Sequence, residues 1–310
     1  MASSIKEKTR SFRKCLGINN RSSVDALVLP DYKNEYAYEL EKGENMDIDD
    51  TFSPSLRAGV SLIRNIPTHS IWATADEKKA FCVQNDSLCR LYPDLTTSVI
   101  AVGFPKNRVA YVEVNGVVYL TNYFKIGSIT NYVFTEFVDI NQVYKIKMPA
   151  GQDIEYFWSR LYVARDNILW FSDALRFNRL NLIQNFKVFP AEIDLIAATE
   201  NGMYVSAGGV TYFLEGTNPH KFTLRPVAPY GAYRGQKIIV PGELILKGAT
   251  TKPVPVWASS EGMCAGLPSG ELLNLTMNNY IMPEGHSFAC FLKKDKTKKE
   301  GYSQLITTVK

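Results

Sequence analysis

The side chains best suited to acid–base or metal chemistry are scattered along this chain. Its three histidines, His69, His220 and His286, lie far apart in the sequence. None has a second histidine, a cysteine or an acidic residue at the spacing of a zinc or catalytic site. We therefore expect no metal-binding or catalytic histidine.

One acidic run has a partial resemblance to a calcium-binding loop. Asp47, Asp49 and Asp50 lie in the run NMDIDD, which gives three carboxylates in four residues. A calcium loop of the helix–loop–helix type also needs a glycine at its sixth position and a glutamate at its twelfth, and both are missing here. A strand end or a turn is the better interpretation.

The local patterns of common enzymes are missing as well. The sequence contains no G-x-S-x-G serine elbow, no phosphate-binding P-loop and no G-x-G-x-x-G fingerprint. A propeller-type sialidase would need repeated S-x-D-x-G-x-T-W turns, and the segment VARDNILWFSD does not fit them. No spacing supports a catalytic carboxylate pair. We predict a protein that is not an enzyme, and assign no catalytic, cofactor-binding or metal-binding residue and no cofactor.

Aromatic residues could form a surface on which sugars stack. The four tryptophans are Trp72, Trp158, Trp170 and Trp257, and they accompany 17 tyrosines and 16 phenylalanines. Most of these rings lie inside strand-like patterns, as Trp170 does in NILWFSD. We therefore expect them to pack in the core or between sheets.

The cysteines indicate a reducing environment. The chain has five, an odd number without any C-x-x-C pair: Cys15, Cys82, Cys89, Cys264 and Cys290. Cys82 and Cys89 are expected on facing strands of one hairpin, yet reduced and buried thiols are the default for such a chain. The sequence has no apolar run long enough to span a bilayer, and its first residues lack the apolar core of a secretory signal.

Basic side chains concentrate near the two ends, although the net charge is only +4. The two groups are Lys6, Lys8, Arg10, Arg13 and Lys14, and Lys293, Lys294, Lys296, Lys298 and Lys299. Such runs are usually solvated, and the small net charge does not by itself argue for nucleic-acid binding. They are nevertheless the best candidates for contact with DNA or with acidic neighbouring surfaces.

A hairpin pattern recurs five times and must form the framework of the fold. Its turns are centred on Asp86-Ser87, Asn115-Gly116, Asp166-Asn167, Gly208-Gly209 and Ser269-Gly270, each between two apolar strands. Such residues accept the positive φ of two-residue hairpin turns. The first anchors of successive copies are 30, 51, 42 and 60 residues apart, near the length of a four-stranded propeller blade but irregular.

These patterns predict an all-β, β-propeller-like fold of about five to six irregular blades. The propeller-like domain is expected over residues 57–310, with a possible insertion at 122–147 and a closing hairpin at 286–310. Residues 172–186 are the best helical candidate but fit a connecting loop. Residues 1–56 are predicted to be an extended N-terminal arm, because a charged segment of this kind cannot bury enough surface to order itself.

The arm and the first repeats resemble a family of virion proteins from tailed bacteriophages and prophages. The motifs that carry the resemblance are Gly17-Ile18-Asn19-Asn20, the acidic segment Asn45 to Asp50, Arg57-Ala58-Gly59 and His69-Ser70-Ile71-Trp72. The hairpins RVAYVEVNGVVYLTN and GMYVSAGGVTYFLEGTNP also match the style of that family.

The resemblance implies a structural protein of the phage tail or head–tail connector. Such a protein would be made in the host cytoplasm, reside in the virion and assemble in several copies around or onto the DNA channel. Expected partners are copies of itself, neighbouring tail or portal proteins and, non-specifically, packaged or passing DNA, without a membrane anchor. The alternatives are a receptor- or carbohydrate-binding propeller at the virion tip and a glycan-cleaving enzyme.

Overall fold

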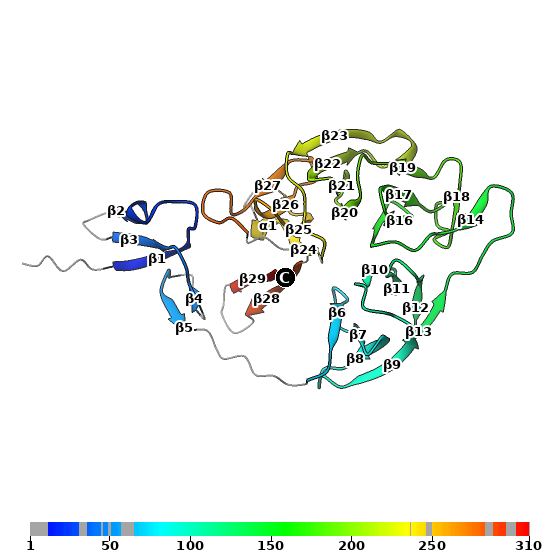
Figure 1. The fold of residues 1–310 in the computed structure, drawn as a ribbon, viewed down its shortest axis with the longest axis horizontal. Coiled ribbons are helices and arrows are strands. Elements are labelled where there is room, and N and C mark those ends of the chain that lie inside the picture. Colours follow the sequence, from blue (N-terminus) through cyan, green and yellow to red (C-terminus); the bar gives the residue numbers. More distant parts are fainter. Residues whose placement is uncertain are drawn as a thin grey trace, which may run out of the picture.

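The fold is known from a computed structural model, which describes residues 12–30, 36–44, 46–48, 51–56, 65–235, 237–245, 250–282, 288–295 and 302–309. Within those residues the protein is all-β and propeller-like. Five four-stranded antiparallel sheets follow one another along the chain and around a common centre (Figure 1). Among the described residues there is one α-helix, α1 (Gly242–Ile245), which has four residues. No described helix has the length and apolar character needed to cross a bilayer.

Each sheet is built from strands that follow one another in the chain, except that the third sheet skips β18 (Arg179–Asn181). The first sheet contains β6 (Thr68–Ala73), β7 (Ala80–Gln84), β8 (Ser87–Leu91) and β9 (Thr97–Val102). The second contains β10 (Ala110–Val114), β11 (Val117–Thr121), β12 (Ile126–Thr130) and β13 (Val133–Glu136). The third contains β15 (Asp153–Phe157), β16 (Arg160–Arg165), β17 (Ile168–Phe171) and β19 (Phe186–Val188).

The last two of these sheets follow the same plan. The fourth contains β20 (Ile193–Ala198), β21 (Gly202–Ala207), β22 (Val210–Glu215) and β23 (Thr223–Ala228). The fifth contains β24 (Ile238–Pro241), β25 (Pro253–Ser259), β26 (Gly262–Gly266) and β27 (Leu272–Asn274). The first strand of each sheet lies nearest the centre, and β10, β15 and β20 contact one another in that order (Figure 1).

The repeat is regular, which corrects the irregular spacing expected from the sequence. The first strands begin at Thr68, Ala110, Asp153, Ile193 and Ile238, and these starts are 42, 43, 40 and 45 residues apart. The five hairpins found in the sequence are not equivalent. Three join the second and third strands of a sheet, but β10–β11 joins the first two and β26–β27 the last two. Mixing these positions produced the apparent irregularity.

The hairpin turns use the chemistry that the sequence indicated. Asn115 and Gly116 have φ values of 51° and 80°, and Gly208 and Gly209 have 60° and 75°. The first turn is shifted by one residue, because Asn85 and not Ser87 adopts positive φ beside Asp86. Asn and Asp tolerate this conformation better than Ser, since their short side chains can bond to the local backbone.

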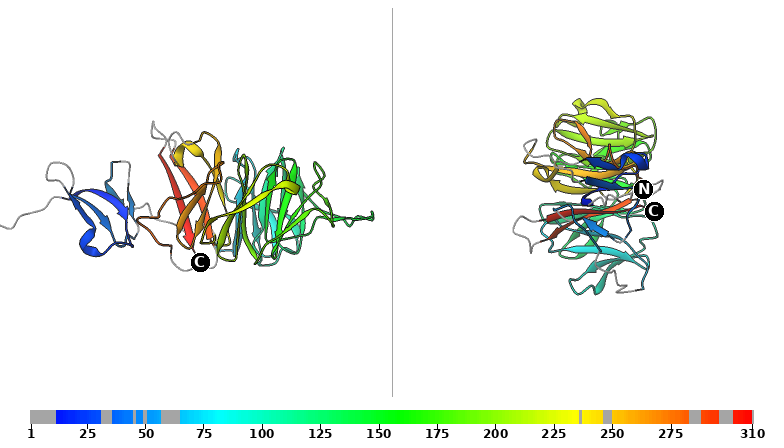
Figure 2. Two further views of the ribbon diagram at one scale, coloured as in Figure 1. Left: turned by 90° about the horizontal axis from the view of Figure 1, so that it is seen from above. Right: turned by 90° about the vertical axis from the view of Figure 1, so that its left-hand side faces the viewer.

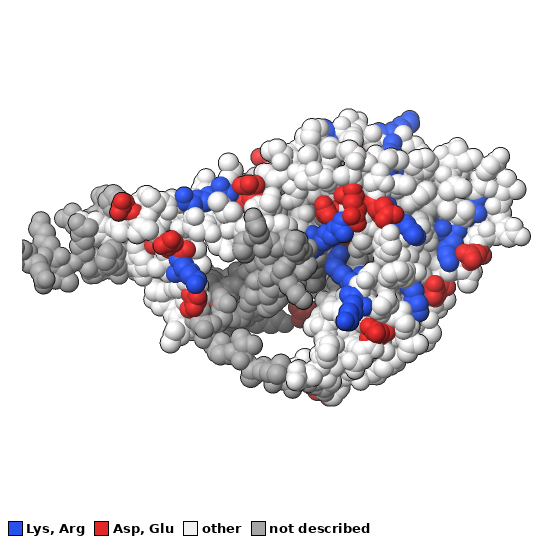
Figure 3. Space-filling model, in the orientation of Figure 1, with Lys and Arg blue, Asp and Glu red and all other residues white. Residues whose placement is uncertain are grey.

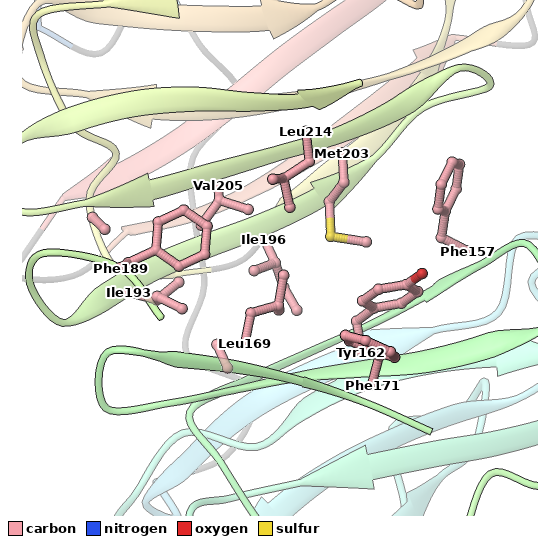
Figure 4. Close-up of a cluster of buried hydrophobic side chains, with 12 residues drawn as sticks. Phe157, Tyr162, Leu169, Phe171, Phe189, Ile193, Ile196, Met203, Val205 and Leu214 are labelled. Carbon is pink, nitrogen blue, oxygen red and sulfur yellow. The ribbon is translucent and has the colours of Figure 1, made fainter. Parts of the chain in front are cut away.

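The hydrophobic core lies in the seams between neighbouring sheets. One cluster joins the third and fourth sheets, where Tyr162 and Phe171 face Ile196, Met203 and others across the seam (Figure 4). Equivalent clusters join the first and second, the second and third, and the fourth and fifth sheets. The second, third and fourth sheets are therefore apolar on both faces. Burial is continuous along β21 (Gly202–Ala207), in which every residue is buried.

The insertion expected at 122–147 is wrong for residues 126–136. Residues 126–136 form β12 and β13, the two outer strands of the second sheet. The irregular connection begins after Glu136 and includes β14 (Lys145–Lys147), which pairs with β18 (Arg179–Asn181) as a separate two-stranded element. The segment 172–186 contains β18 and turns without a helix, as expected for a connecting loop.

The described N-terminal residues are not simply extended. In what we call the N-terminal module (residues 12–56), β1 (Phe12–Ile18) pairs in parallel with β3 (Tyr36–Leu40), and β2 (Val28–Pro30) pairs with the other side of β3. A short hairpin follows, made of β4 (Met46–Ile48) and β5 (Pro54–Leu56). Composition alone suggested disorder, but buried Cys15, Leu27 and Ala37 give the small sheet a core.

The C-terminal hairpin forms where it was expected. Strands β28 (Phe288–Asp295) and β29 (Tyr302–Val309) pair along their whole length. Strand β28 contacts β24, so the hairpin lies beside the fifth sheet (Figure 1). In a side view, the N-terminal module projects from this same end of the molecule, while β14 and β18 lie toward the opposite end (Figure 2).

Candidate functional site

The most densely charged buried group of side chains joins the first strands of three sheets. Asp153 and Glu155 alternate on β15 and are 2% and 8% exposed. The ammonium group of Lys237, just before β24, lies 3.4 Å from the Asp153 carboxylate and 3.1 Å from that of Glu155. Acidic and basic side chains lie side by side near the middle of the ring of sheets (Figure 3).

Period-two alternation explains why both carboxylates reach the next sheet. Residues 153 and 155 lie on the same face of β15, which is turned toward the edge of β20. Asp153 Oδ2 accepts a hydrogen bond from the Ile196 backbone N–H at 3.0 Å, and Glu155 Oε2 accepts one from Ala198 at 3.4 Å. The carboxylates thus satisfy donors that a free strand edge would leave unpaired.

Lys237 forms hydrogen bonds with backbone acceptors, as the two carboxylates do with backbone donors. Its ammonium group donates to the carbonyl of Ile154 at 3.3 Å and to the carbonyl of Ile196. An ammonium group has three protons and no acceptor, so two carboxylates and two carbonyls occupy all of its capacity. One side chain therefore fastens the third, fourth and fifth sheets together at the centre.

One further cation joins this group, and another ion-paired cluster lies on the fourth sheet's side. The Arg108 guanidinium lies 3.7 Å from Asp153 Oδ1, and Arg234 lies 2.5 Å from Glu192 and 2.8 Å from Asp194. Burial raises the pKa of Asp194, and the hydrogen bond and charge of Arg234 oppose that rise. Acidic and basic side chains are matched here, so the centre presents no large field of one sign.

These contacts favour a structural role for the central group. A carboxylate that serves as a general acid or nucleophile must face substrate, whereas Asp153 and Glu155 face backbone donors and Lys237. Among the described residues, no group of three or more His, Cys, Asp or Glu side chains is arranged to hold a metal ion. We call this group (Arg108, Asp153, Glu155 and Lys237) the central network.

The structure places the two described histidines in separate environments. His69 lies on β6, where its Nδ1 is 2.8 Å from the Ser70 hydroxyl, and burial lowers its pKa. His220 packs edge-on against Phe171, and burial and nearby cations lower its pKa as well. Asp47 lies on β4, and Asp49, Asp50 and His286 fall outside the described residues.

Three of the four tryptophans pack between or along strands. Trp257 is fully buried against Tyr204 of the fourth sheet, with 5.4 Å between ring centroids. Trp72 stacks on Tyr111 of the second sheet, also at 5.4 Å, and Trp170 packs against Phe186. Trp158 is the exception, because its side chain is 57% exposed in the turn between β15 and β16.

The four cysteines whose side chains are described are free and buried. Cys82 and Cys89 are direct cross-strand partners in the β7–β8 pair, as the hairpin pattern predicted. Burial raises the pKa of the Cys82 thiol to about 11 and also raises that of Cys89. Both thiols therefore remain protonated and weakly nucleophilic near neutral pH.

The Asn19-Asn20 pair attaches the N-terminal module to the body of the protein. Asn20 Nδ2 donates to the Ile281 carbonyl at 3.0 Å, and Asn20 Oδ1 accepts from the Ile281 N–H at 2.8 Å. The Asn20 backbone N–H donates to Asn279. Buried Asn19 donates to Glu39 and accepts from two following N–H groups, which fixes the turn after β1.

Sequence reasoning missed the central network. The signal available was the alternation of acidic and apolar residues in Asp153-Ile154-Glu155, which is unusual for a strand in which four of the five residues are buried. The residues around Lys237 gave no sign of the network, because its partners are distant in the sequence: Asp153 and Ile154 precede it by 84 and 83 positions, and Ile196 by 41.

Most residues of the two basic segments, which we expected to contact DNA or acidic proteins, lie outside the described residues. Lys6, Lys8, Arg10, Lys296, Lys298 and Lys299 lie outside the described residues, and only the backbone is described for Arg13, Lys293 and Lys294. Lys14 is half-buried on β1. The motif Arg57-Ala58-Gly59 also lies outside the described residues.

Comparisons with known proteins give similarity of fold only. No protein family and no curated protein matches the sequence. Similar solved structures include the N-terminal domain of Nup159 (TM-score 0.49, 9% identity, covering 76% of this chain and 72% of that one) and the WD40 β-propeller domain of Doa1 (0.46, 9%, 79% and 78%). An extracellular domain from B. thetaiotaomicron is similar over 70% of this chain, which spans 29% of that protein (TM-score 0.45, 11% identity).

Proposed function

We propose that this chain is a non-enzymatic structural protein of a tailed-phage particle, a component of the tail or head–tail connector that is present in several copies. Its residence is the virion, and its partners are further copies of itself, neighbouring tail or portal proteins and, without sequence specificity, DNA. The proposal begins from the resemblance of the motifs at 17–20, 45–50, 57–59 and 69–72 to those of phage virion proteins.

The observation that carries the proposal is the way the Gly-Ile-Asn-Asn motif is used. Asn20 makes two side-chain hydrogen bonds to Ile281, and Arg21 pairs with Glu261 at 3.1 Å. Asn20 of the motif and Arg21 after it therefore hold the N-terminal module against the body of the protein. Residues that attach one part of the chain to another in this way suit a structural protein, which must keep a defined shape.

We further propose that the body is a closed ring with six positions. The five four-stranded sheets occupy five of them, and the β28–β29 hairpin, which contacts β24, occupies the sixth between the fifth and first sheets (Figure 1). In a closed ring, the hairpin covers the outer face of the fifth sheet and connects it to the first sheet, so that neither end of the row of sheets is left exposed. The resulting rigid body suits a wall or adaptor that must resist mechanical load.

The central network supports a structural role over a catalytic one. Its carboxylates accept hydrogen bonds from backbone N–H groups of the neighbouring sheet, and Lys237 and Arg108 together balance their two negative charges. Buried charges that satisfy one another contribute to a single well-defined arrangement of the sheets.

A deletion of the coding sequence tests the proposed function. Particles made without the chain should be arrested as heads or as incomplete tails in electron micrographs, and supplying the full chain in trans should restore them. A matched supply of the Gly116→Ala variant, altered at an open turn, should restore them equally. Complete and infectious particles formed without the chain would contradict the proposal.

One observation favours the second candidate, a glycan-binding surface at the particle tip. The Trp158 ring is largely exposed, its Nε1 donates to the Glu200 carbonyl at 3.2 Å, and the Lys252–Glu200 ion pair lies beside it. An aromatic face next to charged groups can stack on a sugar ring. Binding of bacterial surface glycans that Trp158→Ala abolishes, and that the buried-site variant Cys82→Ala retains, would support this candidate over the structural role.

A further inference from the structure

An apolar tip projects from the end of the molecule opposite the N-terminal module. The turn before β14 exposes Val143 and Tyr144, whose side chains are 81% and 63% exposed. The turn after β18 exposes Leu182 and Ile183, at 45% and 59%. The Leu182 N–H donates to the Tyr144 carbonyl at 3.0 Å, so the two turns lie side by side and the four side chains form one patch, which we call the tip.

The tip is stable enough to act as a preformed surface. Strands β14 and β18 pair in register from Lys145–Asn181 to Lys147–Arg179. Asp173 pairs with Lys145 at 2.6 Å and with Arg179 at 3.2 Å, which ties the element to the third sheet. Apolar side chains held out into water by such a framework are unfavourable for a free monomer and typical of a contact surface.

The two segments that carry the tip have a basic excess. The segments that carry it, 137–147 and 173–188, contain five Lys or Arg and two Asp residues, a net charge of +3. The whole chain of 310 residues has a net charge of only +4, so this small element carries much of the excess. A complementary surface should therefore be acidic and should offer apolar groups.

The N-terminal module has these properties. Residues 12–56 contain nine Asp or Glu and five Lys or Arg, a net charge of −4. The module also leaves large apolar side chains in solvent, among them Leu56, Val24 and Phe52 at 88%, 64% and 44% exposure. Module and tip lie at opposite ends of the long axis of the molecule (Figures 1 and 2).

We propose that the tip of one copy docks on the N-terminal module of the next, so that this chain assembles head to tail. The occupant of the tip is a second copy of this chain, selected by apolar contact and by the opposite charges of the two ends. A contact between two different surfaces is heterologous, and it produces a ring when the rotation between copies closes and an open string when it does not.

This proposal adds to the proposed function the contact that joins neighbouring copies. It rests on the proposed function only in taking the virion as the place where the copies assemble. Its test uses the purified full chain, whereas the virion role is tested in particles. A failure of one therefore leaves the other standing.

The test uses two complementary variants. The tip variant carries Val143→Ser and Leu182→Ser, and the module variant carries Leu56→Ser. Each should keep the melting temperature of the parent protein, since the replaced side chains are exposed. The Val99→Ser variant, altered at a 63% exposed position on β9, is the control.

Sedimentation velocity over a series of concentrations gives the outcome. The parent protein and the control should associate, more weakly in high salt because the charges are screened. Each variant alone should associate at least about tenfold more weakly, which corresponds to about 1.4 kcal/mol. A mixture of the two variants should form a one-to-one dimer at parental affinity, because one contact retains both intact surfaces. A parent protein that stays monomeric, or a module variant that associates like the parent, would overturn the proposal.

Discussion

The ammonium group of Lys237 lies 3.1 Å from the carboxylate of Glu155, although Glu155 lies in the third sheet and Lys237 just before the fifth. Lys237 is 12% exposed and Glu155 10% in their side chains. The pair is thus largely removed from water. Both side chains also form hydrogen bonds with backbone groups of β20, Glu155 with the Ala198 N–H and Lys237 with the Ile196 carbonyl. This contact therefore helps to hold the centre of the ring together.

Loss of the Lys237 ammonium should destabilise the protein strongly. In Lys237→Ala, Asp153 and Glu155 remain buried without their shared counter-ion, which typically costs about 3–5 kcal/mol. Lys252→Ala is the matched control, because Lys252 and Glu200 form a 3.0 Å pair that is about half exposed and should contribute at most about 1 kcal/mol. Urea denaturation measures both. Equal losses of unfolding free energy would show that the central network does not hold the sheets together.

The Tyr204 hydroxyl should stabilise the seam between the fourth and fifth sheets. It donates toward the carbonyls of Leu267 and Glu271, at 2.8 and 2.7 Å. Tyr204→Phe leaves these acceptors without that donor, so we expect a loss of about 1–3 kcal/mol. The control is Tyr162→Phe, because the buried Tyr162 hydroxyl has no hydrogen-bond partner in the described part of the chain. Thermal unfolding of the two variants should differ, with Tyr162→Phe neutral or more stable than the parent.

Two turn glycines should respond differently to alanine. Gly270 and Gly116 have similar φ values, 78° and 80°, which any L side chain adopts at a cost of about 1–2 kcal/mol. A Cβ at Gly270 would lie 2.4 Å from the buried Phe213 ring, whereas a Cβ at Gly116 meets nothing within 4 Å. Crowding should add about 1–3 kcal/mol to Gly270→Ala alone. Chemical denaturation measures the free energy of unfolding of both variants. Equal losses of unfolding free energy would show that the Phe213 ring moves aside at little cost.

Stability should fall in alkaline solution partly through Cys82. Its pKa is raised to about 11 in the folded protein by burial, whereas a thiol in the unfolded chain ionises near pH 8.5. The folded state therefore holds the proton to higher pH, and ionisation favours the unfolded state as pH rises through this window. The free energy of unfolding of the parent protein minus that of Cys82→Ala should be constant below about pH 8 and decline up to pH 11. A difference that stays flat would contradict the buried, protonated thiol.

The hairpins could be predicted from the sequence because their signals are local. Asn115-Gly116 and Gly208-Gly209 specify their turns through backbone conformations that few other residues accept. The grouping of hairpins into sheets could not be predicted in the same way. A hairpin between first and second strands, such as β10–β11, has the same sequence pattern as one between second and third strands, such as β16–β17.

Contacts between distant segments account for the other differences. The parallel pairing of β1 with β3 and the attachment of Asn20 to Ile281 order a module whose own composition suggested disorder. The central network depends on Lys237 meeting Asp153 and Glu155, and nothing in the residues around Lys237 indicates this. The sequence thus predicted the strands well and the contacts that hold them together poorly.

The number of copies of this chain in purified particles tests the central claim most directly. Particles should be purified by density gradient, washed in high salt and analysed by quantitative mass spectrometry against a labelled full-length standard. We expect the chain in several copies per particle, in a fixed ratio to the portal protein and retained after the wash. A chain that is missing from the particles, or that is removed by the wash in variable amounts, would contradict its role as a structural component of the virion.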